Sequence, residues 1–144
     1  MAQVDYLHLC DLSFMDQVGK HCIIGMFDII HAPAFPATHP TMSLAMRILG
    51  QPGEAIQVTF ELGRPNGNVL ATVAMEVVAG PDGGANLNLN LNQTQFPEPG
   101  RYTLKILSGK EVLASRSLRL VKMDLPQQGP PPQTPAPQDK NKLH

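Results

Sequence analysis

Residues 85–108 read ANLNLNLNQTQFPEPGRYTLKILS, and this stretch decides the fold class. It begins with a strict alternation of leucine and asparagine, passes a short segment with two prolines and a glycine, and alternates again from Tyr102 onward. Successive side chains of a β-strand point to opposite faces, so the leucines share one face and the asparagines share the other. The pattern therefore predicts two antiparallel strands, each with one buried and one wet face.

The segment between these two strands predicts a tight corner. Pro97 and Pro99 cannot donate to a β-ladder, and Gly100 adopts backbone angles that other residues avoid. Tyr102 follows Gly100 by two residues. This order resembles the tyrosine corner of immunoglobulin-like sandwiches, in which the ring packs in the core and the hydroxyl bonds to the backbone.

Similar patterns elsewhere in the chain predict six further strands, at residues 6–10, 21–30, 42–49, 54–62, 69–78 and 112–121. Residues 21–30 are apolar on both faces, which predicts a central strand that forms a hairpin with the first one. Residues 42–49 alternate but contain good helix formers, so a short helix stays open there although the alternation favours a strand. The irregular pattern at residues 115–117 indicates a bulge or an exposed edge.

Together these segments predict an all-β fold, an antiparallel two-sheet β-sandwich of immunoglobulin-like style with about seven or eight strands. A small barrel is the alternative. The sandwich domain is expected to cover residues 1–124. Residues 125–144 are rich in proline and poor in large apolar groups, which predicts a disordered tail with polyproline II character.

The composition excludes several classes of function. The chain has 144 residues, of which 42% are hydrophobic and 16% charged, as expected for one globular domain. A formal net charge of −1 and an isoelectric point near 6.5 argue against a nucleic-acid binder. The sequence has no polybasic segment and no apolar run near the roughly 20 residues that span a bilayer.

The first residues lack the basic start of a secretory signal and include Asp5 and Asp11, so we expect the protein in the cytoplasm. Cys10 and Cys22 are then expected to be reduced thiols.

Residues 31–40, HAPAFPATHP, predict a proline-rich connection between strands. Pro33, Pro36 and Pro40 are expected to prevent both a β-ladder and a helix. Loops between strands are where sandwiches place binding residues. The candidate binding residues are His31, Phe35, Pro36 and His39. The alternative, favoured by the usual length of loops, is a rigid crossover between the two sheets.

The N-terminal half also gathers the residue types that ligate metals or transfer protons. These residues are His8, Cys10, Asp11, His21, Cys22, Asp28, His31 and His39. Their spacing matches no zinc motif, and buried thiols with hydrogen-bonded histidines explain them better. Asp11 and Asp28 are a candidate carboxylate pair, but no nucleophile motif accompanies them, and turn capping is the favoured interpretation.

Several short motifs occur together: Leu9-Cys10-Asp11, Gly19-Lys20 before Ile24-Gly25-Met26-Phe27-Asp28-Ile29-Ile30, Phe35-Pro36-Ala37 with His39-Pro40, and Pro99-Gly100-x-Tyr102. As a set they resemble an uncharacterised family of small bacterial all-β proteins, one of the domains of unknown function. The resemblance covers roughly residues 5–122. It implies a β-sandwich of unknown function and supplies no catalytic residues.

These observations predict a non-catalytic cytoplasmic module that acts through protein–protein contacts or self-association. Its partner is an unknown protein or a second copy, with no cofactor, metal, nucleic acid, membrane or small-molecule substrate evident. The alternative is a metal-binding protein or a metal-dependent enzyme that uses the His, Cys and Asp residues of the N-terminal half.

Overall fold

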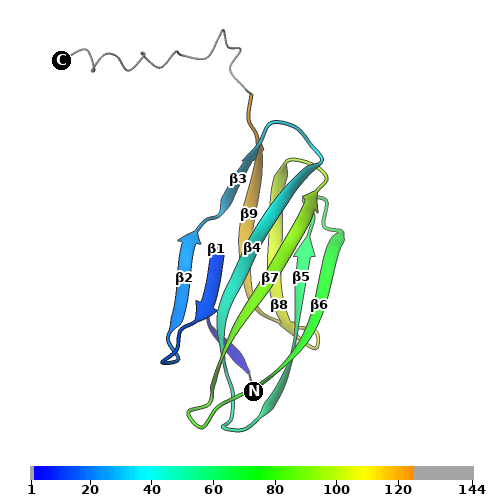
Figure 1. Cartoon of the computed structure of the whole chain (residues 1–144). Coiled ribbons are helices and arrows are strands. Elements are labelled where there is room, and N and C mark those ends of the chain that lie inside the picture. The colour runs from blue at the N-terminus through cyan, green and yellow to red at the C-terminus, as the bar shows by residue number, and fades with distance from the viewer. Residues whose placement is uncertain (1, 125–144) are drawn as a thin grey trace, which may run out of the picture.

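The computed structural model describes residues 2–124, which form two packed β-sheets (Figure 1). The strands are β1 (Gln3–Met15), β2 (His21–Met26), β3 (Ile29–Ala32), β4 (Ala37–Leu49), β5 (Ala55–Gly63), β6 (Val69–Val78), β7 (Gly84–Phe96), β8 (Gly100–Ser108) and β9 (Glu111–Lys122). The sheets have the orders β2-β1-β4-β7 and β3-β9-β8-β5-β6. The predicted two-sheet sandwich is confirmed, and the small barrel is not what the chain forms.

The core lies between the two sheets and takes the inward residues of each. Phe60 and Leu62 of β5 are fully buried, as the alternation in residues 54–62 predicts. Leu44 and Met46 of β4 are buried opposite them, which confirms that residues 42–49 are a strand rather than a helix. Each such side chain contributes about 1.5–3 kcal/mol by leaving water.

The tyrosine corner is also confirmed. Tyr102 is fully buried, and its hydroxyl donates to the Glu98 carbonyl at 2.7 Å and accepts from the Glu98 N–H at 3.1 Å. Its ring meets that of Phe96 edge to face, with centroids 5.0 Å apart. The corner therefore joins β7 of one sheet to β8 of the other around a packed aromatic pair.

The prediction of one central strand at residues 21–30 is wrong. The chain bends at Phe27 and Asp28, so that β2 lies at the edge of one sheet and β3 at the edge of the other. This division raises the number of strands to nine among the described residues. A run that is apolar on both faces fits one strand buried on both sides. It also fits two short strands, such as β2 and β3, that belong to different sheets.

The proline-rich connection is shorter than predicted, because β4 begins at Ala37 and includes Pro40. Ala37, Thr38 and His39 pair with β7, whereas β1 first pairs with β4 at Ser43. Pro40 therefore lies where β4 has a neighbour on one side only, and its missing N–H costs no ladder bond on the open side. Residues 33–36 cross from one sheet to the other, as the crossover interpretation predicts, with a cis bond before Pro36.

Of the two features expected at residues 115–117, the structure shows the exposed edge: these residues are exposed, and β3 pairs with β9 only at residues 119–122. They pair with β8 in regular register, and the bulge lies beside them at residues 112–114. The predicted tail at residues 125–144 lies outside the described residues. Within residues 2–124 there is no helix long and apolar enough to cross a membrane.

Candidate protein-interaction surface

β1 reverses direction in its middle, and this reversal places the hairpin that its second half forms with β2 on the outside of the sheet. A straight strand would place Met15 roughly 30 Å from Tyr6, since each residue advances about 3.3 Å. Met15 pairs with His21, yet the His21 ring lies 2.6 Å from the Tyr6 hydroxyl. The arrowhead of β1 accordingly points back toward the end of the molecule that holds the N-terminus (Figure 1). The second half of β1 and all of β2 form a hairpin, residues 12–26, that lies on the outer face of its own sheet.

The bend is built from Asp11 and Gly25. Gly25 has a φ of 72°, a left-handed conformation that glycine adopts readily. A Cβ atom at Gly25 would collide with the carboxylate of Asp11, so the two residues lie in direct contact. The turn at the other end of the hairpin is closed by Asp16, whose carboxylate accepts from the N–H groups of Val18 and Lys20.

A polar cluster holds the hairpin against the sheet. The Tyr6 hydroxyl bonds His21 Nδ1 at 2.6 Å, and His21 Nε2 lies 2.6 Å from Asn88 Oδ1 on β7. Because an amide oxygen only accepts, Nε2 donates to Asn88, and in that tautomer Nδ1 accepts from the Tyr6 hydroxyl. Burial raises the pKa of Tyr6, which keeps its hydroxyl a donor.

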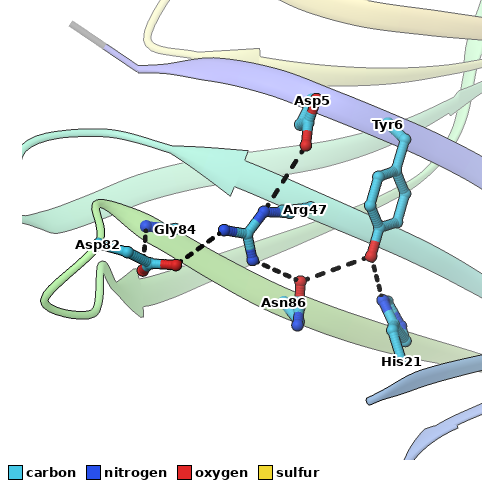
Figure 2. Close-up of polar contacts among 7 residues, drawn as sticks. All are labelled: Asp5, Tyr6, His21, Arg47, Asp82, Gly84 and Asn86. Carbon is cyan, nitrogen blue, oxygen red and sulfur yellow. Dashed lines mark hydrogen bonds and ion pairs between the residues drawn. The ribbon is translucent and has the colours of Figure 1, made fainter. Parts of the chain in front are cut away.

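Arg47 completes this cluster on the neighbouring strand. Its guanidinium bonds Asn86 Oδ1 at 3.3 Å and pairs with Asp82 at 3.1 Å and with Asp5 at 3.6 Å (Figure 2). Asn86 and Asn88 are thus structural partners, while Asn90 and Asn92 stay exposed. The predicted outer row of asparagines is present, and half of it holds the hairpin and the strand ends together.

The face of the hairpin that meets the sheet carries Ser13 and His21 beside Ile23. Ser13 bonds Ser43 between their hydroxyl oxygens at 2.5 Å, and the Cys10 thiol donates to the Ser43 carbonyl at 3.4 Å. Cys10, Ser13 and Ser43 are all buried, and burial raises the pKa of the Cys10 thiol. A buried, protonated thiol is a poor nucleophile and a poor metal ligand.

The opposite face of the hairpin is apolar and exposed. Leu12 and Phe14 of β1 are 50% and 40% exposed, and Ile24 and Met26 of β2 are 51% and 63% exposed. Leu12 pairs with Ile24, so these side chains adjoin one another across the hairpin. We call these four residues the hairpin patch. Isolated exposed apolar residues are ordinary, whereas a contiguous group of them is a candidate interaction surface.

The outer edge of β2 lies beside this patch and is open within residues 2–124. β2 pairs with β1 on one side and has no neighbour on the other. Its sequence, HCIIGM, contains no lysine, arginine, acidic residue or proline. Proteins usually protect an exposed strand edge with such residues, because unpaired N–H and C=O groups accept further strands.

The edge of β1 that faces β9, in contrast, is protected by an arginine side chain. Arg116 Nε donates to the Leu7 carbonyl at 2.8 Å, which occupies a backbone acceptor on the open side of β1. A groove of about 530 Å³ runs here, lined by His8, Leu9, Met26, Phe27, Asp28, Arg116 and Ser117. The guanidinium of Arg116 therefore covers this edge of β1, whereas β2 contains no charged side chain that could cover its own edge in the same way.

Replacing Arg116 with glutamine is expected to raise the pKa of His8. Burial is the main cause that lowers this pKa below its ordinary value of 6.5, and the charge of Arg116, 3.4 Å from Nδ1, is the second cause. Removing a positive charge favours the imidazolium form, so the NMR titration of His8 should move to higher pH. Arg64→Gln is the control, because Arg64 pairs with Glu98 instead. An unchanged His8 titration in Arg116→Gln would contradict this contact.

The predicted binding residues of the proline-rich segment are only partly brought together. His31 and His39 line a pocket of about 260 Å³ that ends on Phe96. The ring of His39 also lies 5.7 Å from that of Phe27. Phe35 turns toward the core, and Pro36 is exposed in the crossover. A binding role for these four residues stays a prediction.

The eight metal-ligand candidates are distributed over several surfaces. His21 is bonded to Tyr6, Cys10 is buried under the hairpin, and Cys22 lies on its outward face. Asp11 contacts Gly25, whereas Asp28 lines the groove beside Arg116. No group of three or more His, Cys, Asp or Glu residues placed to hold a metal ion occurs within residues 2–124. No observation favours the metal-binding alternative.

Sequence reasoning missed the hairpin patch. The strand predicted at residues 6–10 leaves out Leu12 and Phe14, and the central strand predicted at residues 21–30 places Ile24 and Met26 in the core. The available signal is the small polar residue Ser13 between Leu12 and Phe14, on the face opposite to theirs, where a second layer can cover it.

Two sheets, antiparallel except where β3 pairs in parallel with β9, are joined through a tyrosine corner and define an immunoglobulin-like β-sandwich. The chain belongs to a family of unknown function (DUF6941), whose model matches residues 5–121. This confirms the resemblance found in the sequence. No curated protein matches the chain.

Several solved structures are similar to the chain at low sequence identity, and one of them exceeds a TM-score of 0.5. The chain is similar to Pseudomonas fluorescens alkylpurine DNA glycosylase AlkC bound to DNA containing an abasic site analog, with 12% identity and a TM-score of 0.52, over 83% of this chain and 30% of that chain. An immunoglobulin-like protein from Pseudomonas aeruginosa gives 11% identity and a TM-score of 0.45, over 83% and 96%. A beta-glucosidase from Listeria innocua in complex with glucose gives 10% and 0.48, over 87% and 16%. The chain spans under a third of the glycosylase, and the likeness concerns the fold alone.

Proposed function

We propose that this protein is a non-catalytic interaction module that receives an extended strand of a protein partner at the open edge of β2. The observation that carries the proposal is the hairpin patch, four exposed apolar side chains beside an unprotected strand edge. In this proposal the module works in the cytoplasm and uses no cofactor, nucleic acid, membrane or small-molecule substrate.

Strand addition explains both features of this surface. The backbone groups of β2 that face away from β1 supply hydrogen bonds, which give affinity without demanding a particular sequence. Side chains on the added strand then pack beside Ile24 and Met26, and such cross-strand pairs contribute about 0.2–1 kcal/mol each. Because β2 contains no lysine, arginine or acidic residue, the matching strand is itself apolar.

The polar cluster beneath the hairpin makes the surface suitable for binding. His21 is fixed by Tyr6 and Asn88, and Ser13 is fixed by Ser43, so both strands of the hairpin are attached to the sheet. A surface that is ordered before it binds loses less conformational entropy on association.

Photo-cross-linking in the source cells tests the proposal. A photoreactive residue placed at Ile24 is expected to link one defined protein, whereas the same residue at exposed Gln57 on β5 links none. Adding Leu12→Lys should remove the product, because a charge in the patch opposes burial of its neighbours. Equal labelling from the two positions, or no product from Ile24, would exclude the hairpin as a docking surface.

A further inference from the structure

We infer that the strand received by β2 is β2 of a second copy, paired antiparallel about a two-fold axis that passes beside Ile24. The inference rests on the proposed function, since it names the partner for the same surface. A two-fold interface requires a surface that complements itself, because each copy presents the same residues to the other.

The charges at the two ends of β2 have this self-complementary arrangement. Lys20 precedes the strand by one residue and Asp28 follows it by two. With the axis at Ile24, Lys20 of each copy lies opposite Asp28 of the partner subunit, which forms two equivalent ion pairs. If the axis were at Ile23, Lys20 would lie opposite a methionine instead. The charges therefore select one register among those that the uncharged strand permits.

Both charged groups are available for this role. Lys20 and Asp28 are exposed, and the ion pairs found within residues 2–124 involve neither of them. They stand at opposite ends of the six-residue strand β2, with Asp28 at the bend that leads to β3, so they do not pair within one copy. An attraction between them is therefore a property of two molecules rather than of one.

The side chains between the two charges also fit the register. The axis brings the two copies of Ile24 face to face, and Cys22 of each copy lies opposite Met26 of the partner subunit. These residues share the outward face of the hairpin, so the pairing joins the two hairpin patches into one apolar strip. Ile24 and Met26, at 51% and 63% exposed, are the residues that gain most from such contact.

Cysteine cross-linking measures the register directly. Residues opposite each other in antiparallel strands have Cα atoms about 4.5–5.5 Å apart, within the span of a disulfide. In a Cys22→Ser background, Ile24→Cys is expected to form a covalent dimer under mild oxidation. Leu12→Cys is the control: it shares the face and the exposure, but in this arrangement its two copies are roughly 14 Å apart, too far for a disulfide.

A charge exchange tests the ion pairs. Lys20→Glu and Asp28→Lys are each expected to weaken dimerisation about tenfold or more, because each single change places two like-charged pairs across the interface. The double variant restores attraction and should return the dissociation constant close to that of the wild type. Analytical ultracentrifugation of the full chain gives these dissociation constants. If Lys20 and Asp28 acted only within one molecule, the double variant would not restore dimerisation.

The outcomes separate this inference from the proposed function. A wild-type chain that stays monomeric at hundreds of micromolar, or Ile24→Cys that links no faster than Leu12→Cys, overturns self-pairing. If residue 24 nevertheless cross-links a different protein in cells, the docking surface stands and its partner is another protein. If residue 24 links nothing and the chain is monomeric, both the inference and the proposed function are wrong.

Discussion

Tyr102→Ala is expected to lower the free energy of unfolding by about 3–5 kcal/mol, the range for removing a buried aromatic ring. Tyr102 is fully buried at the corner between the sheets, and its ring packs edge to face on Phe96. Its removal leaves a cavity where the chain passes from β7 in one sheet to β8 in the other. The surrounding side chains cannot fill this cavity unless the corner itself moves. A typical domain has a free energy of unfolding of only about 5–15 kcal/mol, so the variant should lose a large fraction of its stability.

Tyr102→Phe is the matched control and separates the ring from the hydroxyl. It keeps the contact with Phe96 and removes the bonds between the hydroxyl and the backbone of Glu98. The expected loss is about 1–2 kcal/mol, since the Glu98 groups lose a partner. Urea unfolding followed by circular dichroism measures both variants. If phenylalanine costs as much as alanine, the corner depends on the hydroxyl alone and the packing argument is wrong.

The parts of the fold that the sequence predicts are those with local signals. The alternation at residues 85–96 and 54–62 has the period of a strand. Burial follows it at residues 55–62, whereas residues 85–89 are all half-buried, since Asn86 and Asn88 are held by Arg47 and His21. The corner at Tyr102 is specified within a few residues by prolines, Gly100 and the tyrosine itself. In each case the physical cause lies in neighbouring residues, so a single sequence is enough to find it.

The parts that the sequence does not predict depend on contacts between distant segments. The reversal of β1 needs Asp11 beside Gly25, and its consequence is a bond between Tyr6 and His21. Nothing in the spacing of these residues indicates that they meet. Residues 21–30 illustrate the same limit, because their apolar faces fit a buried strand and a folded-over hairpin equally well.

The candidate site was harder to predict than the fold for a related reason. Sequence reasoning placed function in the loop that holds His31 and His39, because loops in sandwiches often bind ligands. The structure instead exposes Ile24 and Met26 on a strand. Hydrophobicity alone does not distinguish an apolar residue that is buried in the core from one that is buried by a partner.

Gly83→Ala is expected to have the second large effect, a loss of about 2–4 kcal/mol, of which the left-handed backbone accounts for roughly 1–2 kcal/mol. Gly83 has a φ of 85° and is buried in the turn before β7. A Cβ atom there would lie 2.6 Å from the carbonyl oxygen of Gly50, which is too close for any real contact. The Gly50 N–H donates to the Gly83 carbonyl at 2.7 Å, so the two turns cannot separate without losing this bond.

Gly53→Ala isolates the collision from the backbone conformation. Gly53 has a similar φ of 78°, but a Cβ atom there meets nothing within 4 Å. It should therefore lose only the conformational part, roughly 1–2 kcal/mol. Thermal and urea unfolding of both variants give the difference, which measures how firmly the turn after β4 is held to the turn before β7. Equal losses would mean that these turns move apart freely, and that the bond between Gly50 and Gly83 does not fix the ends of the strands.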